Sequence, residues 1–228
     1  MEKKYYKFRS ARTENLQDLL NCKIRLSCLE QFNDAFEGYV VFRNQEMVSK
    51  DKYDNKMGEY KDRILRRKFY CLASSDDPNY IEHCHLMWAH YANGHRGFCI
   101  EFNENILNGF PESKTGESKT SIKVEYPDTF SVPEIYLDDN SYVINEQLFY
   151  QIVSKKGKQW KYENEVRLVL KNEEEHKISQ ESISAIYVGA KIDGLAERTL
   201  VGIAKKLEVP CFKMELSESY YELVKNPL

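Results

Sequence analysis

The spacing of hydrophobic and polar positions predicts a chain in which strands and helices are interspersed. Residues 5–9 (YYKFR) are aromatic with partial alternation, which is typical of a strand, and residues 24–27 (IRLS) repeat that character. Between them, residues 13–20 (TENLQDLL) place leucines at helical spacing, and Thr13 can cap the first turn. The chain therefore begins as strand, short helix, strand.

Further elements follow from the same patterns. Strands are expected at 68–73, 97–102, 121–126, 163–170, 184–190, 209–214 and 220–223. Helices are expected at 82–91, at 143–154 and around Leu200, Ile203, Ala204 and Leu207. Without internal repeats, this order predicts an α+β fold in a single domain, 1–228. Its mixed or largely antiparallel split sheet would have about seven strands surrounded by helices.

Three polar segments are expected at the surface. Residues 47–67 are dense in charge with little apolar periodicity, which predicts an exposed helical insertion. Residues 108–121 have the composition of a surface loop, and residues 31–38 that of an ordered loop. Residues 155–158 (KKGK) form a basic cluster, interpreted as a solvated turn with a phosphate contact as the alternative.

Composition narrows the classes of function. A formal net charge of −3 gives no global basic field, so nucleic-acid binding would need a local patch. No stretch has the length of a membrane span and no signal peptide opens the chain, which predicts a cytoplasmic protein without a membrane partner. The six cysteines form no CxxC pair and are expected to be reduced and packed in the core.

Four of the five histidines fall between His83 and His95, which raises the question of a metal or a nucleophile. Side chains at His83 and His85 would point apart on a helix, and no HExxH motif completes a ligand set, so no metal is expected. Cys84 and Cys99 are better interpreted as packed thiols than as nucleophiles. GxSxG, Walker and GxGxxG motifs do not occur.

Two carboxylates and a guanidinium near the end of the chain are the stronger candidate site. In a strand, Glu163, Glu165 and Arg167 would share one face because side chains alternate with a period of two. Such a face can be solvent-exposed with cross-strand pairing, or it can aim a carboxylate at a developing cation. Trp160 and Tyr162 would offer flat walls for a ring-shaped ligand.

Three ordered blocks resemble a large bacterial family known as domain of unknown function 2971. They are residues 32–37 (FNDAFE), residues 87–92 with 95–98 (MWAHYA, HRGF) and residues 160–167 (WKYENEVR). The opening residues 6–10 and the strand at 186–189 also match, so the resemblance covers nearly the whole chain. Ala35 departs from the usual proline of the family, which changes loop stiffness more than chemistry.

The chain more distantly resembles the ADP-ribosyltransferase group, through Arg9, residues 15–16, residues 24–27 and the Glu163-x-Glu165 pattern. This resemblance implies an ADP-ribosyltransferase-like split sheet with NAD as the cofactor. Glu165 would hold the nicotinamide-ribose hydroxyl and stabilise the oxocarbenium-like transition state, and Glu163 would orient the acceptor. Arg9 would bind the diphosphate, and His90 or Tyr91 would line the pocket.

Asn33, Glu37 and Arg167 complete the candidate cofactor-binding residues, and His90 joins Glu163 and Glu165 as a candidate catalytic residue. The main functional hypothesis is therefore an NAD-using ADP-ribosyltransferase or NAD glycohydrolase, in a phage-defence or toxin context, with a small-molecule nucleotide as partner.

Two alternatives stay open. One is a non-catalytic or nucleic-acid-directed module that uses Lys155, Lys156 and Lys158. The other is an acid/base hydrolase or nuclease that uses Asp34, Glu37, Glu163 and His90. The acceptor and the oligomeric state stay open too.

Overall fold

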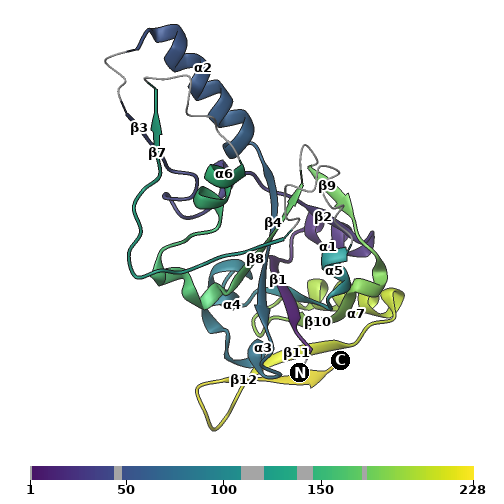
Figure 1. Ribbon diagram of the computed structural model, residues 1–228. Coiled ribbons are helices and arrows are strands. Elements are labelled where there is room, and N and C mark those ends of the chain that lie inside the picture. The colour runs from purple at the N-terminus through teal and green to yellow at the C-terminus, as the bar shows by residue number, and fades with distance from the viewer. Residues whose placement is uncertain (1, 44–47, 109–120, 138–145, 171–173) are drawn as a thin grey trace.

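A mixed eight-stranded sheet forms the centre of the computed structural model, which describes residues 2–43, 48–108, 121–137, 146–170 and 174–228 (Figure 1). Across the sheet the strands are β12 (Leu223–Pro227), β11 (Cys211–Leu216), β10 (Ile183–Val188), β5 (Gly97–Phe102), β1 (Lys4–Ser10), β4 (Lys68–Ser75), β8 (Glu165–Leu170) and β6 (Ser121–Lys123). β10 and β11 pair in parallel, and the other neighbours are antiparallel. The predicted α+β class with a mixed sheet is confirmed.

The sheet is split between its two central strands, β1 and β4. They pair only over three positions, from Lys4 opposite Ser75 to Tyr6 opposite Ala73. Beyond Tyr6, β1 stays paired with β5 as far as Ser10, while β4 stays paired with β8 as far as Lys68. Each strand thus follows its other neighbour, and a wedge opens between them. In this wedge the Lys7 ammonium donates to the main-chain oxygen of Cys71 at 2.7 Å.

Helices cover both faces of the sheet and give it two hydrophobic cores. On one face, α1 (Thr13–Leu20), α5 (Asn105–Asn108) and α7 (Gly194–Leu207) pack on the core that contains Tyr70 and Phe98. On the other face, α3 (Tyr80–His83) and α4 (His85–Tyr91) pack on the core around Phe8. Trp88 is fully buried there, with its ring edge-on to Phe8. Alternate side chains of β1 therefore pack into different cores on the two faces of the sheet.

A third core lies against the β4–β8–β6 half. It joins α2 (Lys50–Tyr60), the following π-helix η3 (Lys61–Leu65), α6 (Glu146–Val153) and the parallel pair β3 (Val41–Arg43) and β7 (Glu134–Tyr136). In Figure 1, α2 extends away from the main sheet. Within the charged segment 47–67, α2 and η3 are helical, and Tyr60 and Ile64 are buried against this core.

The remaining short elements connect these layers. They are β2 (Lys23–Arg25) paired with β9 (Glu175–Lys177), and the 3-10 turns η1 (Leu29–Gln31), η4 (Lys158–Glu163) and η5 (Gln180–Ser182).

Some predicted elements differ from the structure. The single helix expected at 82–91 is two, broken at Cys84, and the Trp88 indole donates to the oxygen of Ile81 across the break at 3.0 Å. The cap of α1 is Arg12, without a side-chain cap hydrogen bond, rather than Thr13. The expected loop at 108–121 falls, for residues 109–120, outside the described residues.

The strand expected at 163–170 begins only at Glu165. Glu163 ends η4, and Asn164 between them adopts a left-handed conformation with φ of 41°. The two glutamates therefore do not share a strand face by alternation. Their side chains nevertheless meet, because the left-handed residue turns the chain into β8.

Candidate functional site

A cavity of about 210 Å³ opens in the wedge between β1 and β4; we call it the split cavity. Both strands line it, together with the loop after η1, the end of α4 and the turn into β8. Its lining residues are Tyr6, Lys7, Phe8, Arg9, Arg25, Ser27, Gln31, Phe32, Asn33, Phe69, Cys71, Leu72, Ala73, Met87, Tyr91, Lys156, Glu163 and Glu165. Chain segments distant in sequence therefore meet where the sheet divides.

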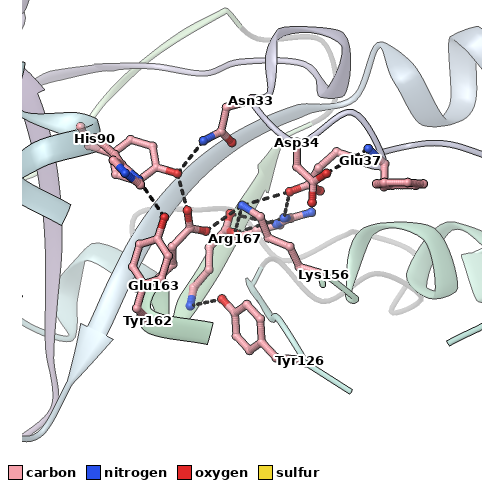
Figure 2. A network of polar contacts seen from close by, with 12 residues as sticks. Asn33, Asp34, Glu37, His90, Tyr126, Lys156, Tyr162, Glu163 and Arg167 are labelled. Atoms are coloured by element: carbon pink, nitrogen blue, oxygen red, sulfur yellow. Dashed lines mark hydrogen bonds and ion pairs between the residues drawn. The ribbon is translucent and has the colours of Figure 1, made fainter. Parts of the chain in front are cut away.

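Three carboxylates and two cations are buried together at one end of this cavity (Figure 2). We call Glu37, Lys156, Glu163, Glu165 and Arg167 the carboxylate cluster. Lys156 Nζ lies 2.7 Å from Glu163 Oε2, 3.3 Å from Glu37 Oε1 and 3.6 Å from Glu165 Oε2. With all five groups ionised the cluster has one negative charge in excess, so it favours a cationic or hydrogen-bond-donating ligand.

Glu163 is the carboxylate of the cluster that is held least tightly by cations. One oxygen accepts from Lys156, and the other accepts a short hydrogen bond from the Tyr91 hydroxyl. Burial raises the pKa of Glu163 above its usual value, against the opposing effects of Lys156 and Tyr91. Asn33 donates to the same Tyr91 hydroxyl at 2.9 Å, which fixes the orientation of the phenol. A buried carboxyl group with a raised pKa in a cavity wall is a candidate for proton transfer.

Glu165 is held differently. Both of its oxygens accept from Arg167, at 3.0 Å from Nε and 3.1 Å from Nη2. Burial would raise the pKa of Glu165, but Arg167 and Lys156 outweigh burial and lower it to about 2. The guanidinium also donates to the main-chain oxygen of Val153 at 2.9 Å. Glu165 is thus a permanently ionised group in a bidentate pair.

The loop at 31–38 is fastened to the cluster through Glu37. Its Oε1 accepts from Arg167 Nη2 at 2.7 Å and lies near Lys156, while its buried Oε2 has no hydrogen-bond partner among the described residues. Phe32 of the same loop lies over the Arg167 guanidinium, 5.3 Å from ring centroid to Cζ. The predicted ordered loop is therefore a wall of the site.

At its other end, the split cavity continues into a second cavity of about 540 Å³, the basic groove. The two share Lys7, Phe8, Arg9, Arg25 and Tyr91, and the groove adds Ser10, Arg12, Glu14 and Asn15. Arg25 is paired with Asp18 at 2.6 Å. Arg9 and Arg12 have no carboxylate within 4.0 Å in the part of the chain that the structure describes. The groove is suited to an anion.

Five of the eight candidate site residues line the split cavity: Arg9, Asn33, Tyr91, Glu163 and Glu165. Glu37 and Arg167 lie behind its floor and hold the carboxylates in place. His90 is exposed on the far side of α4, where its Nδ1 lies 2.9 Å from the Tyr162 hydroxyl. Asp34 accepts from the main-chain nitrogen of Phe36 at 3.0 Å, within its own turn.

The basic cluster at 155–158 is not a solvated patch as predicted. Lys156 is only 4% exposed, within the carboxylate cluster, and Lys158 pairs with Asp128. After α6 the chain runs beside Glu125, whose main-chain oxygen accepts from the main-chain nitrogen of Lys156 at 3.0 Å; Lys156 is buried, Lys155 is half-buried and Lys158 is exposed. Nothing in the sequence distinguishes Lys156 from Lys155. Lys7 was also missed, although its spacing from Arg9 by two residues on a predicted strand puts both on one face.

The cysteines of the histidine-rich segment, and His95, pack within the fold. Burial raises the pKa values of Cys84 and Cys99, as expected for packed thiols. Within the described ranges, no three His, Cys, Asp or Glu side chains are grouped to hold a metal ion. His95 stacks on Trp88, with 6.1 Å between ring centroids.

Comparison with known proteins gives one family match, over part of the chain. Residues 87–168 match the family model described as "Protein of unknown function (DUF2971)", which confirms the first resemblance. The matched segment contains Tyr91, Lys156, Glu163, Glu165 and Arg167. No curated protein and no solved structure matches the chain. Among the described helices, none is long and apolar enough to cross a membrane.

Proposed function

We propose that this chain, whose residues 87–168 match the DUF2971 family model, is an NAD-using enzyme that cleaves the bond between nicotinamide and ribose. The ADP-ribose group would pass either to water or to an acceptor. The observation that carries the proposal is the opposite charge of the two connected ends of the site. The carboxylate cluster lies at one end, and the basic groove lies at the other.

NAD has a matching distribution of charge. Its nicotinamide ring is a pyridinium cation on a ribose, and a diphosphate anion follows the ribose. Placing the ribose against Glu163 and the diphosphate against Arg9 and Arg12 sets each charge beside its opposite. Phe32 and Tyr91 offer flat walls at the ring end of the split cavity. A purely anionic ligand would face repulsion from the excess negative charge of the cluster.

Within this proposal, Glu163 is the reacting carboxylate and Glu165 is its support. Departure of nicotinamide breaks the C–N bond, the electron pair leaves with the ring, and positive charge develops on the ribose. A carboxylate beside that charge stabilises the transition state, and the same ionised carboxylate can accept the hydroxyl proton of the attacking water or acceptor. Both oxygens of Glu165 accept from Arg167, whereas one oxygen of Glu163 accepts from the neutral Tyr91 hydroxyl and does not contact Arg167.

The test is release of nicotinamide from NAD by the purified protein, with and without protein and nucleic-acid acceptors. Glu163→Gln keeps the size of the side chain and removes its charge, so release should fall at least about 100-fold. Glu104→Gln is the matched control, because Glu104 is exposed and far from the cavity lining. Circular dichroism and thermal unfolding would show that each variant is folded.

Two outcomes would reject the proposal. One is intact NAD after prolonged incubation of folded wild-type protein under all acceptor conditions. The other is nicotinamide release that Glu163→Gln leaves unchanged. Cleavage of a nucleotide phosphoester with NAD intact would favour the acid/base hydrolase alternative, which uses the same carboxylate. The nucleic-acid alternative loses its basis at Lys156, since that side chain is buried among carboxylates.

A phage-defence or toxin context follows naturally from such an activity, because consumption of NAD stops growth. Expression of the wild-type chain in a bacterium should then lower cellular NAD, and Glu163→Gln should not. Unchanged NAD together with activity on the purified nucleotide would point to a protein acceptor or a trigger that the host lacks.

A further inference from the structure

One amine of the site has no part in the proposed cleavage. Lys7 lies where the split cavity and the basic groove join, and it lines both. Its Nζ donates to the main-chain oxygen of Cys71 and lies 4.7 Å from the centre of the Tyr70 ring. No carboxylate of the described residues lies within 4.0 Å of it, in contrast to Lys156. A cavity-lining lysine without an acidic partner calls for an explanation.

The surroundings of Lys7 favour the neutral amine, which is the nucleophilic form. The charged and titratable groups that act on it are Arg9, Cys71, Glu163 and Glu165. Burial, followed by the positive charge of Arg9, lowers the pKa of Lys7 to about 8, although both glutamates oppose the shift. Desolvation and a neighbouring cation are the two established ways to activate an amine toward carbonyl carbon. An ordinary lysine is neutral in only about one molecule in a thousand at pH 7.4.

We infer that Lys7 is a carbonyl-reactive site, which forms an imine with the aldehyde of a phosphorylated sugar. The geometry supplies three groups that such a reaction needs in one cavity. Lys7 provides the amine, Glu163 provides a carboxyl group, and Arg9 with Arg12 of the adjoining groove can hold the phosphate. The inference deepens the proposed function and rests on it for its natural ligand, since the ADP-ribose left by NAD hydrolysis has a free aldehyde in its open-chain form.

The chemistry balances without another reagent. The nitrogen lone pair attacks C1 of the open-chain sugar, and a proton moves from nitrogen to oxygen to give a carbinolamine. The Glu163 carboxyl group then protonates the carbinolamine hydroxyl, which leaves as water, and an iminium ion forms. Water can reverse each step, so the adduct persists only while the sugar remains bound. The permanent cation of Arg9 beside the iminium keeps it reactive.

The test is reductive trapping of the wild-type protein with ribose 5-phosphate and cyanoborohydride at pH 7.5, followed by peptide mapping. Ribose 5-phosphate is used because it tests the amine without any NAD cleavage. Lys7 should be modified at least tenfold faster than any other lysine, and unphosphorylated ribose should react at Lys7 more slowly. Lys7→Arg should lose the adduct, while Lys4→Arg on the same strand should retain it.

The mapping on wild-type protein decides the question even if Lys7→Arg fails to fold. Modification of Lys7 no faster than that of Lys4 or Lys23 would overturn the inference. Selective trapping at Lys7 with no nicotinamide release would support the inference and reject the proposed function. Nicotinamide release without selective trapping would support the proposed function and overturn the inference, so the two failures can be told apart.

Discussion

At the scale of single residues, the site depends on which of several similar side chains the backbone turns inward. Lys156 and Lys158 are two positions apart, yet one is buried among three carboxylates and the other is 63% exposed in its side chain. The attraction of Glu165, Glu163 and Glu37 raises the pKa of Lys156 even though burial alone would lower it. Lys156 is therefore a charge that the fold requires.

Substitution of Lys156 by methionine should destabilise the protein by about 3 kcal/mol, because it leaves three buried carboxylates with one cation. Lys158→Met is the matched control and should change the free energy of unfolding by less than about 0.5 kcal/mol, since its ion pair is solvated. Urea unfolding at pH 7 measures both. Equal effects of the two substitutions would contradict this account of the carboxylate cluster.

At the scale of elements, the start of β5 packs so closely against the end of β1 and the residue after α4 that no side chain fits there. A Cβ atom at Gly97, where β5 begins, would lie 2.0 Å from the main-chain oxygen of Arg9 and 3.0 Å from Ala92. The turn from α4 into β5 uses left-handed residues at Asn93, Gly94 and His95 to reach this close approach. The approach fixes the end of β1 that carries Arg9 against the end of α4 that carries Tyr91.

Gly97→Ala should therefore cost about 3 kcal/mol, because backbone atoms must move to admit the methyl group. It should also weaken nicotinamide release through the displacement of Arg9. Gly202→Ala is the control, because Gly202 lies within α7 with no atom within 4 Å of the added Cβ, so it should stabilise by about 0.5–1 kcal/mol. Thermal unfolding of both variants would test the pair, and a neutral Gly97→Ala would count against the close approach.

At the scale of the whole molecule, the sheet is two half-sheets that join over three residue pairs and part where the site lies. Where the two half-sheets part, the carboxylate cluster and the third core fill the space beside β4. Stability and site chemistry are consequently linked through pH. The pKa of Glu165 is lowered in the folded state, and that of Glu163 is raised.

The signs of these two effects are opposite. The stabilisation from Glu165 is complete above its unfolded pKa of about 4.5 and is lost as pH falls toward the folded value of about 2. Glu163 instead adds a penalty that is absent at low pH and grows as pH rises above about 4.5. Glu165→Gln should thus be less stable than wild type at pH 7, by about 2–3 kcal/mol, with the difference shrinking between pH 4.5 and 2.5.

Urea unfolding of wild type, Glu165→Gln and the control Glu104→Gln across this pH range would measure the effect. Glu104→Gln should run parallel to wild type, because Glu104 is exposed. A Glu165→Gln curve that also stays parallel to wild type down to pH 2.5 would show that Glu165 is not held ionised by Arg167.

The sequence by itself determined the elements that local pattern encodes. β1, α1, β5 and α7 all lie where apolar spacing predicts them, and β8 does so from Glu165 onward. The blocks around Tyr91 and Glu163 also lie within the segment that the family model matches, and they contribute Met87, Tyr91, Glu163 and Glu165 to the cavity lining. Periodicity records which face of an element is buried, so these features need no knowledge of their partners.

Only the tertiary structure decided which charged side chains pair with one another. Which glutamate is bound by Arg167, which lysine enters the carboxylate cluster, and where Lys7 lies all depend on contacts between segments distant in the chain. A left-handed residue at Asn164 and the bridge between Glu125 and Lys155 set these contacts, and neither alters the hydrophobic pattern. The chemistry of a buried charge depends on its neighbours in space, and for this site the split between β1 and β4 determines which residues those neighbours are.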